Sequence, residues 1–261
     1  MLLPLVIGHR GAAAVAPENT LESIRQAWLQ GVSWVEFDVQ LTRDDQVVVF
    51  HDDDLHRTSN GRGAIRNTDW GRIQLLDAGS WFSKEWQGIR VPNLQQTFAL
   101  LLDLGLNANV EIKIPDAYME DRVYIEKTVS KTISIIDQYW TKNRPLLISS
   151  FSTSALRVLM EKAPRLPRGL LLWGQPDGWL AQARSLQCVT INIADQFASA
   201  EWVKAIRQAG YEAAVYTINN VKRARELIEL GVNGLFSDCP AMVLAGLRAR
   251  NLSGETPTGI K

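Results

Sequence analysis

Short apolar runs alternate with longer stretches of helical periodicity along most of the chain. Such runs are typical of strands buried on both faces, and they occupy residues 5–9, 34–39, 109–113, 146–150, 169–172, 189–193, 213–217 and 234–237. The amphipathic stretches predict helices over residues 20–30, 94–104, 118–139, 153–162, 178–184, 200–208, 221–230 and 241–248. Eight strand–helix units in succession predict an α/β fold, with a parallel sheet closed as a TIM (β/α)8 barrel.

Two kinds of local signal mark the ends of these helices. Asn19 stands three residues before Glu22, and this spacing predicts Asn19 as the N-cap of a capping box. Gly31, Gly210 and Gly231 each follow a helical stretch, where glycine is typical of a left-handed C-terminal cap. These signals support the boundaries that the periodicity predicts.

The segment after the second strand departs from the strand–helix alternation. Residues 39–51 continue as strand-like positions on both sides of Asp44-Asp45, which predicts a β-hairpin that turns at this pair. Antiparallel pairing about that turn puts Asp38 opposite His51, and cross-strand partners lie ~4.5–5.5 Å apart. The hairpin is therefore expected to bring a histidine beside the acidic residues of the second strand.

Residues 52–91 fit neither the strand nor the helix pattern and are rich in turn-forming residues and tryptophan. A structureless loop of this length is uncommon in a compact domain, so we interpret the segment as a small inserted subdomain over the rim where the strands end. The sequence thus predicts one barrel domain over residues 1–250, with this insertion, and a flexible tail over residues 251–261.

Composition and charge limit the class of protein. The 261 residues are 46% hydrophobic with a formal net charge of zero, so no charge excess attracts nucleic acid or an anionic membrane. The two cysteines, Cys188 and Cys239, are expected to be buried free thiols. The sequence shows no signal-peptide pattern and no apolar run long enough to span a membrane. We therefore expect a cytoplasmic protein with no nucleic-acid partner and no stable membrane association.

Acidic residues gather at two predicted strand ends. Glu36 and Asp38 have alternate spacing, so both project from one face of the second strand, and Glu111 lies near the end of the next barrel strand. If these ends converge on one rim of a barrel, the three carboxylates repel one another unless a cation lies between them. Oxygen ligands favour Mg²⁺, Ca²⁺ or Mn²⁺ over zinc. The alternative is that these residues pair with basic side chains or cap loops.

Two of the three histidines also stand at strand ends. His9 and His51 could act as a general acid and a general base, although either could equally be a hydrogen-bonded structural group. Arg10 and Lys113 carry positive charge suited to a phosphate, unless they only balance the carboxylates. His56 falls inside the insertion, and we expect it to be a surface or local structural residue.

Many short motifs occur in a characteristic order along the chain. They are His9-Arg10-Gly11, Pro17-Glu18-Asn19-Thr20, Glu36-Phe37-Asp38, Phe50-His51-Asp52, Arg57-Thr58, Gly61-Arg62-Gly63, Glu111-Ile112-Lys113, Ser150-Phe151, Thr217-Ile218-Asn219, Gly231-Val232-Asn233-Gly234 and Ser237-Asp238. With these motifs the chain resembles the glycerophosphodiester phosphodiesterase family over roughly 240 of its 261 residues. Residues 77–82 and 167–172 further resemble the cytoplasmic enterobacterial-type enzyme.

The resemblance implies hydrolysis of glycerophosphodiesters to sn-glycerol 3-phosphate and an alcohol, on a (β/α)8 barrel with an inserted subdomain. It implies that the three carboxylates hold Mg²⁺ or Ca²⁺ and that the two strand-end histidines are the acid–base pair. Arg10 and Lys113 would contact the phosphate. By analogy with related phosphoinositide phospholipases C, one route is attack by the glycerol 2-hydroxyl, giving a cyclic phosphate that water then opens.

Three residues depart from those common in the family. Tyr216, Asn233 and Ser237 are expected at the back wall of the pocket, where they would affect substrate preference.

Two alternative functions remain open. A phospholipase C- or D-like hydrolase acting on intact lipid would need an exposed apolar rim or a basic membrane face, and the sequence indicates neither. A catalytically silent barrel that binds phosphodiesters would have lost a histidine or carboxylate, and each is present.

Overall fold

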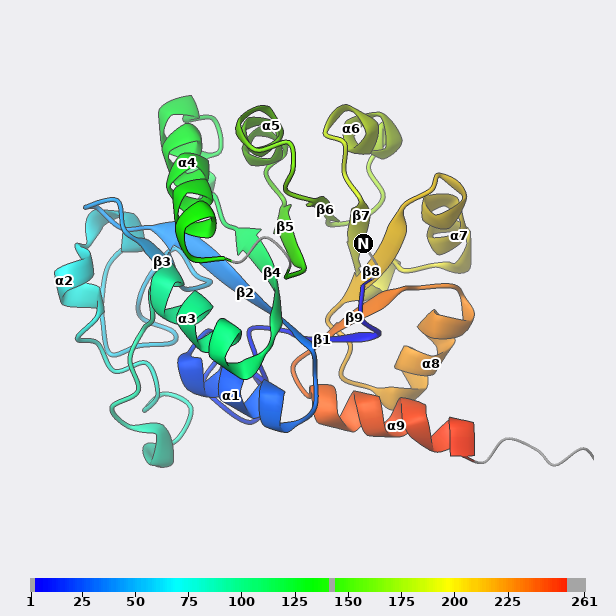
Figure 1. Cartoon of the computed structure of the whole chain (residues 1–261), viewed down its shortest axis with the longest axis horizontal. Coiled ribbons are helices and arrows are strands. Elements are labelled where there is room, and N and C mark those ends of the chain that lie inside the picture. The colour runs from blue at the N-terminus through cyan, green and yellow to red at the C-terminus, as the bar shows by residue number, and fades with distance from the viewer. Residues whose placement is uncertain (1–2, 141–143, 253–261) are drawn as a thin grey trace, which may run out of the picture.

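The computed structural model describes residues 3–140 and 144–252. Within these residues nine strands form one sheet in the order β1-β9-β8-β7-β6-β5-β4-β2-β3, and an additional β1–β2 pairing joins its ends. The eight strands other than β3 pair in parallel around the ring, and the helices lie around its outside (Figure 1). The predicted TIM barrel is therefore confirmed, and β3 is one extra antiparallel strand.

The element bounds follow the predicted alternation. The strands are β1 (Val6–Gly8), β2 (Trp34–Leu41), β3 (Val47–Val49), β4 (Asn107–Ile112), β5 (Leu146–Ser150), β6 (Arg168–Leu172), β7 (Thr190–Ala194), β8 (Glu212–Tyr216) and β9 (Gly234–Ser237). The helices are α1 (Leu21–Leu29), α2 (Trp70–Ile73), α3 (Leu94–Leu104), α4 (Arg122–Tyr139), α5 (Thr153–Lys162), α6 (Trp179–Ser185), α7 (Ala200–Gln208), α8 (Val221–Glu229) and α9 (Pro240–Leu252). Short 3₁₀ turns occur at Ile65–Asn67, Lys84–Trp86, Asp116–Tyr118 and Asp195–Phe197.

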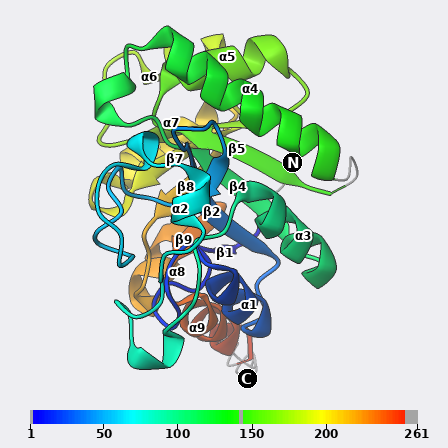
Figure 2. The same ribbon diagram turned by 90° about the vertical axis from the view of Figure 1, so that its left-hand side faces the viewer.

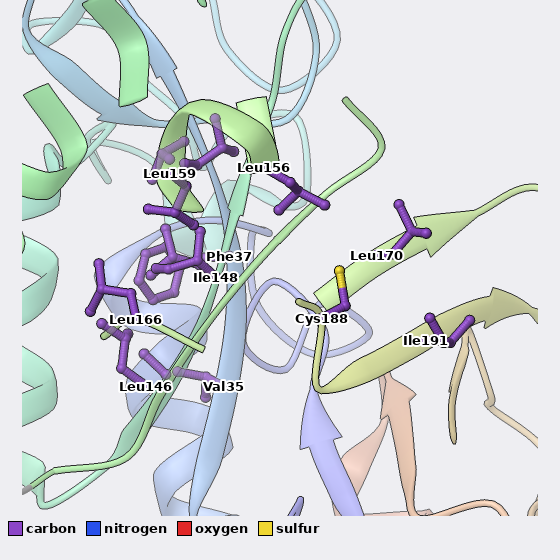
Figure 3. Close-up of a cluster of buried hydrophobic side chains, with 14 of the residues drawn as sticks. Val35, Phe37, Leu146, Ile148, Leu156, Leu159, Leu166, Leu170, Cys188 and Ile191 are labelled. Atoms are coloured by element: carbon purple, nitrogen blue, oxygen red, sulfur yellow. The ribbon is translucent and has the colours of Figure 1, made fainter. Parts of the chain in front are cut away.

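Side-chain alternation along β2 separates the core from the barrel interior. Val35 and Phe37 are fully buried in the main apolar cluster, which includes Ile148 of β5 and Leu156 of α5 (Figure 3). Because successive strand residues point to opposite faces, the residues between them point into the barrel. The packing of β2 against the helical layer therefore aims Glu36 inward.

The hairpin forms, but its register differs from the predicted one. Val39 pairs with Val49, and the Phe50 backbone N–H donates to the Asp38 carbonyl at 3.0 Å. Asp38 therefore lies opposite Phe50, and the predicted pairing of Asp38 with His51 is wrong by one residue. Because a one-residue shift exchanges the two faces of a strand, Phe50 enters the core of the insertion while His51 reaches the barrel mouth.

The start of α1 corrects a second prediction. The N-cap is Thr20, whose side chain accepts a hydrogen bond from the Ser23 backbone N–H, rather than Asn19. Three predicted glycine caps are confirmed, because Gly31, Gly210 and Gly231 all have φ between +80° and +97°. Asn19 does not cap the helix, so its side chain can contact other residues.

Residues of the insertion pack with Val48 and Phe50 of the hairpin in a small apolar cluster, separate from the main core. The cluster contains Val48, Phe50, Leu55, Ile65, Ile73, Ala78 and Val91. The segment lies on the same side of the barrel as β3 (Figure 1), the side that faces the viewer in Figure 2. Trp81 and Phe82 line a surface hollow together with His9 and Arg10, so the insertion borders the barrel mouth.

Both cysteines are free; Cys188 is buried as expected, whereas Cys239 is only half-buried, because it follows β9 on the rim.

Most of the predicted tail over 251–261 lies outside the described residues, and its first two residues belong to α9. Across the described ranges, no helix has the length and apolar character needed to cross a membrane.

Candidate active site

A cavity of about 280 Å³ opens at the carboxyl ends of the barrel strands. Six of the seven predicted site residues line it, and Asp38 lies buried directly behind them. The lining consists of His9, Arg10, Glu36, His51, Asn109, Glu111, Lys113, Ser149, Phe151, Leu171, Trp173, Tyr216, Thr217 and Phe236. The barrel therefore brings together groups that are more than 200 residues apart in the sequence.

The three predicted acidic residues form one cluster. Glu36 and Asp38 project inward from β2, and Asp38 pairs in register with Glu111 of β4. Each residue offers a carboxylate oxygen that lies within 4.8 Å of the other two, and all three residues are buried. Such a group of oxygens is the donor set that Mg²⁺ and Ca²⁺ prefer.

The electrostatics of this cluster fit a cation. Burial, together with the charges of Asp38 and Glu111, raises the pKa of Glu36 well above its usual 4.5. Burial also raises the pKa of Glu111, although Lys113 opposes the shift. Glu36 Oε1 is buried and has no hydrogen-bond partner within the described part of the chain. A hard cation at this position would satisfy that oxygen and relieve the repulsion.

Both predicted cationic residues lie against the acidic cluster. The Arg10 backbone N–H donates to Glu36 Oε2 at 2.9 Å, and Arg10 Nε lies 3.5 Å from Asp38 Oδ2. Lys113 Nζ lies 3.0 Å from Glu111 Oε1. Each cation thus balances carboxylate charge within the protein, and both remain on the cavity wall.

The loop after β1 holds Arg10 in an unusual backbone conformation. Arg10 has φ 53° and Gly11 has φ 88°, both in the left-handed region. A Cβ on Gly11 would lie 2.4 Å from Ser23 Oγ of α1, so only glycine allows this close approach. Ser23 Oγ donates to the Arg10 carbonyl at 2.8 Å. Tight packing on α1 therefore turns the Arg10 N–H toward Glu36.

His9 is oriented by a carboxylate from the other end of the chain. His9 Nδ1 lies 2.7 Å from Asp238 Oδ1, and Asn219 Nδ2 donates to Asp238 Oδ2 at 2.7 Å. The other ring nitrogen, Nε2, lies 3.9 Å from Glu36 Oε2. An ionised Asp238 favours the proton on Nδ1, so Nε2 faces the acidic cluster.

His51 has the same kind of partner, supplied by its neighbour in sequence. His51 Nδ1 lies 2.6 Å from Asp52 Oδ1, and Nε2 lies 3.4 Å from Lys113 Nζ. Burial lowers the pKa of His51, and Arg10 and Lys113 lower it further against the opposing charge of Asp38. The two histidines therefore present Nε2 to the cavity, that of His9 near Glu36 and that of His51 near Lys113.

The third histidine lies outside the cavity, as predicted. The His56 side chain is exposed, and its Nδ1 lies 2.9 Å from Asp54 Oδ1 within the insertion. The five residues that follow His51 carry His56 away from the barrel mouth, so it is a surface residue.

Several polar residues that support the site were not identified from the sequence. Asn19 Nδ2 donates to Asp38 Oδ2 at 2.8 Å, and its Oδ1 accepts the Asp38 backbone N–H. Asp52 and Asp238 orient the histidines. All three residues lie within the family motifs, which is the signal that could have identified them. Their chemistry alone gave no signal, because asparagine and aspartate are common in loops.

The β5–β8 side of the mouth is aromatic. Phe151, Trp173 and Tyr216 line the cavity, and Phe197 contacts Trp173 edge-on with ring centroids 5.8 Å apart. Trp173 is 66% exposed, and Phe151 and Phe197 are also exposed. The expectation that the molecule lacks an exposed apolar rim is therefore wrong, because these residues follow three separate strands and meet only in the barrel.

The three residues that differ from those common in the family do not lie together in the structure. Tyr216 lines the cavity as expected, and its hydroxyl donates to the Leu172 carbonyl at 2.9 Å. Ser237 is fully buried beside Asn219, and Asn233 accepts from a backbone N–H of β8. Neither is part of the cavity lining, so their predicted place at the back wall is wrong.

Comparisons with known proteins show the family of the chain. The model of the glycerophosphoryl diester phosphodiesterase family matches residues 9–242. A glycerophosphodiester phosphodiesterase from Caldanaerobacter subterraneus is 33% identical over 92% of this chain and 96% of its own length. One from Bacillus subtilis is 30% identical over 90% of this chain and 84% of its own.

A solved structure is similar over almost the whole chain. It is an Oleispira antarctica phosphodiesterase in complex with the product sn-glycerol-3-phosphate, with a TM-score of 0.89 and 34% identity. The match covers 95% of this chain and 97% of that one. With the family model matched from His9 to beyond β9, the chain belongs to the glycerophosphoryl diester phosphodiesterase family of enzymes.

Proposed function

We propose that this enzyme hydrolyses glycerophosphodiesters to sn-glycerol 3-phosphate and an alcohol, using a divalent cation and two histidines. The observation that carries the proposal is that the acidic cluster and two histidines, each with its Nδ1 held by a carboxylate, meet at the mouth of one cavity. The family of the chain and the product named for the Oleispira relative support the choice of substrate.

Glu36, Asp38 and Glu111 would hold the cation, which we propose to be Mg²⁺ or Ca²⁺. When bound, such an ion supplies Lewis-acid polarisation of a phosphate oxygen and neutralises charge that develops in the transition state. The backbone N–H of Arg10 keeps one Glu36 oxygen in place, and Asn19 does the same for Asp38. The ligands are therefore oriented by the protein before any cation binds.

His9 and His51 would transfer the protons that the reaction requires. One removes the proton of the attacking hydroxyl, and the other protonates the leaving alkoxide. Asp238 and Asp52 hold the proton on Nδ1 of each ring, so that both Nε2 atoms face the cavity. Hydrogen-bonded carboxylates of this kind fix the tautomer of a catalytic histidine and stabilise its charged form.

Arg10 and Lys113 would contact the phosphate. Burial alone would lower the pKa of Arg10, but the carboxylates of Asp38, Glu18 and Glu36 raise it above its usual value. Burial opposes the charge of Lys113 in the same way, and Glu111 and Asp38 raise its pKa. Both side chains therefore stay cationic on the cavity wall, where they can stabilise a phosphodiester.

The direct test is the release of sn-glycerol 3-phosphate, followed with a coupled dehydrogenase. Glycerophosphocholine, -ethanolamine, -glycerol and -inositol are each incubated with the enzyme, with EDTA and without it. We expect release in the absence of EDTA and its loss in the presence of EDTA. If none of the four substrates releases sn-glycerol 3-phosphate, the proposed substrate class is contradicted. Release that persists in the presence of EDTA would contradict the cation requirement but not the substrate class.

The exposed aromatic rim favours a second candidate, hydrolysis of intact lipid. Trp173 and Phe197 form an apolar surface that continues from the cavity wall, where an acyl chain could lie. The same assay with mixed micelles of a phospholipid distinguishes the two functions, because the second candidate requires faster turnover of lipid than of glycerophosphocholine.

Four expectations from the sequence remain predictions. They are a cytoplasmic location, no stable membrane association, no nucleic-acid partner and a barrel domain over residues 1–250.

A further inference from the structure

Arg57 of the insertion contacts two carboxylates at once. Its Nε and Nη2 donate to Asp52 Oδ2 and Oδ1 at 2.5 and 2.8 Å. Its Nη1 and Nη2 donate to Glu18 Oε2 and Oε1 at 2.9 and 2.6 Å. The planar guanidinium thus forms a two-bond fork with each partner, a geometry that a lysine cannot reproduce.

Each of these carboxylates in turn contacts a side chain of the candidate site. Asp52 Oδ1 lies 2.6 Å from Nδ1 of His51. Glu18 Oε1 accepts from Nη1 of Arg10 at 2.6 Å. One continuous chain of hydrogen bonds therefore runs from His51 through Arg57 to Arg10, and it crosses from the insertion to the loop after β1.

Arg57 makes these bonds without being part of the cavity lining. It is absent from the residues that surround the central cavity, and its side chain is 40% exposed. The insertion also shares an apolar cluster with the hairpin and has backbone bonds such as Leu55 N–H to the Gly63 carbonyl. The segment therefore has packing and backbone contacts that do not involve the fork.

We infer that Arg57 is a positioning residue of the reaction, which fixes the direction of the His51 ring through Asp52 and of the Arg10 guanidinium through Glu18. The inference rests on the proposed function, because it assigns Arg57 a part in that hydrolysis. It also gives the insertion a part in the reaction, since the inserted segment supplies the group that links the residues after β3 to the loop after β1.

The test uses Arg57→Ala and Arg57→Lys, with Arg43→Ala as the matched control. Arg43 makes the same kind of two-bond fork, to Asp69, on the surface of the neighbouring hairpin, and it contacts no site residue. We expect kcat/KM for glycerophosphocholine to fall by about 10- to 100-fold in both Arg57 variants, the range for groups that orient functional histidines. Arg43→Ala should retain the wild-type value.

Two further measurements separate positioning from a structural role. Millimolar guanidinium chloride should restore part of the activity of Arg57→Ala, because the free ion can occupy the space between Glu18 and Asp52. In a His51→Ala background the added loss from Arg57→Ala should be smaller than in the wild type, since one branch of the chain no longer has a catalytic group to position.

Three results would overturn the inference while the wild type is active. They are a loss below twofold in Arg57→Ala, a melting temperature that falls in step with activity, and an equal loss with and without His51. A wild type that releases no sn-glycerol 3-phosphate would instead contradict the proposed function, and the inference would fall with it.

Discussion

The two halves of the barrel mouth differ in chemistry. Every charged group that lines the cavity belongs to β1, β2, β4, the hairpin or the residues directly after them, and each is bonded to another side chain or to a backbone group. The β5–β8 half contributes Phe151, Trp173 and Tyr216 to the lining, and Trp173 is largely exposed. The barrel thus separates a rigid polar wall from an open aromatic one.

This difference predicts a division of labour. The polar half is pre-organised by short bonds, so it can act on charge that develops during the reaction. The aromatic half offers apolar area and few hydrogen bonds, so it can contribute to binding of the uncharged parts of a substrate. Substitutions in the first half should lower kcat, and those in the second should raise KM.

Removal of the cation should have the largest effect. EDTA should reduce turnover to the background rate, and added Mg²⁺ or Ca²⁺ should restore it, because the buried carboxylates otherwise repel one another. Glu36→Gln should lower kcat by at least about 10³-fold.

Glu126→Gln is the matched control, because Glu126 pairs with Lys162 on the exposed face of α4. Its activity should equal that of the wild type. Full turnover by a preparation shown to be metal-free would refute the cation requirement.

The histidines should have the next largest effect. His9→Ala and His51→Ala should each lower kcat by ~10² to 10⁴-fold, the usual contribution of a general acid or base. The loss should be smaller for a nitrophenyl ester in the variant that lacks the acid, because that leaving group needs no proton.

His56→Ala serves as the control and should stay within a few-fold of wild type, since His56 is an exposed residue of the insertion. If neither strand-end variant loses rate, the histidines have only structural roles.

The aromatic half gives a smaller effect of a different kind. Trp173→Ala should raise KM by about 3- to 10-fold with kcat nearly unchanged, since burial of part of an aromatic ring contributes on the order of 1 kcal/mol. Steady-state kinetics measures both constants. Trp28→Ala is the control, because Trp28 is exposed on α1 and lies outside the cavity lining. A fall in kcat as large as that of a histidine variant would remove the distinction between the two halves.

The smallest effect concerns the titration of His51. Burial lowers its pKa in the folded protein below the usual 6.5, so the unfolded chain binds more protons on this residue just below pH 6.5. Its contribution to stability is therefore complete above pH 6.5 and is lost as the pH falls through the folded pKa. NMR titration of the metal-free protein should give a midpoint below 6.5, with His51→Ala identifying the signal. A midpoint above 6.5 would contradict the buried position.

Some features of the site could be predicted because they depend on near neighbours in the chain. The alternate spacing of Glu36 and Asp38 placed both on one face of β2, and the acidic cluster is observed. The hairpin was predicted with its turn near the correct place, but its register was wrong by one residue. Sequence alternation cannot set that register by itself, because apolar cores lie on both sides of this hairpin and neither face is marked as exposed.

The amino-acid sequence by itself determined the eight strand–helix units and the residues that end the strands, because periodic burial depends only on local spacing. Tertiary structure decided the partners. His9 meets Asp238, 229 residues away, because β1 pairs with β9 when the barrel closes. The aromatic rim and the fork of Arg57 likewise arise only when separate loops converge. No local pattern encodes such meetings, since they depend on how the whole sheet closes.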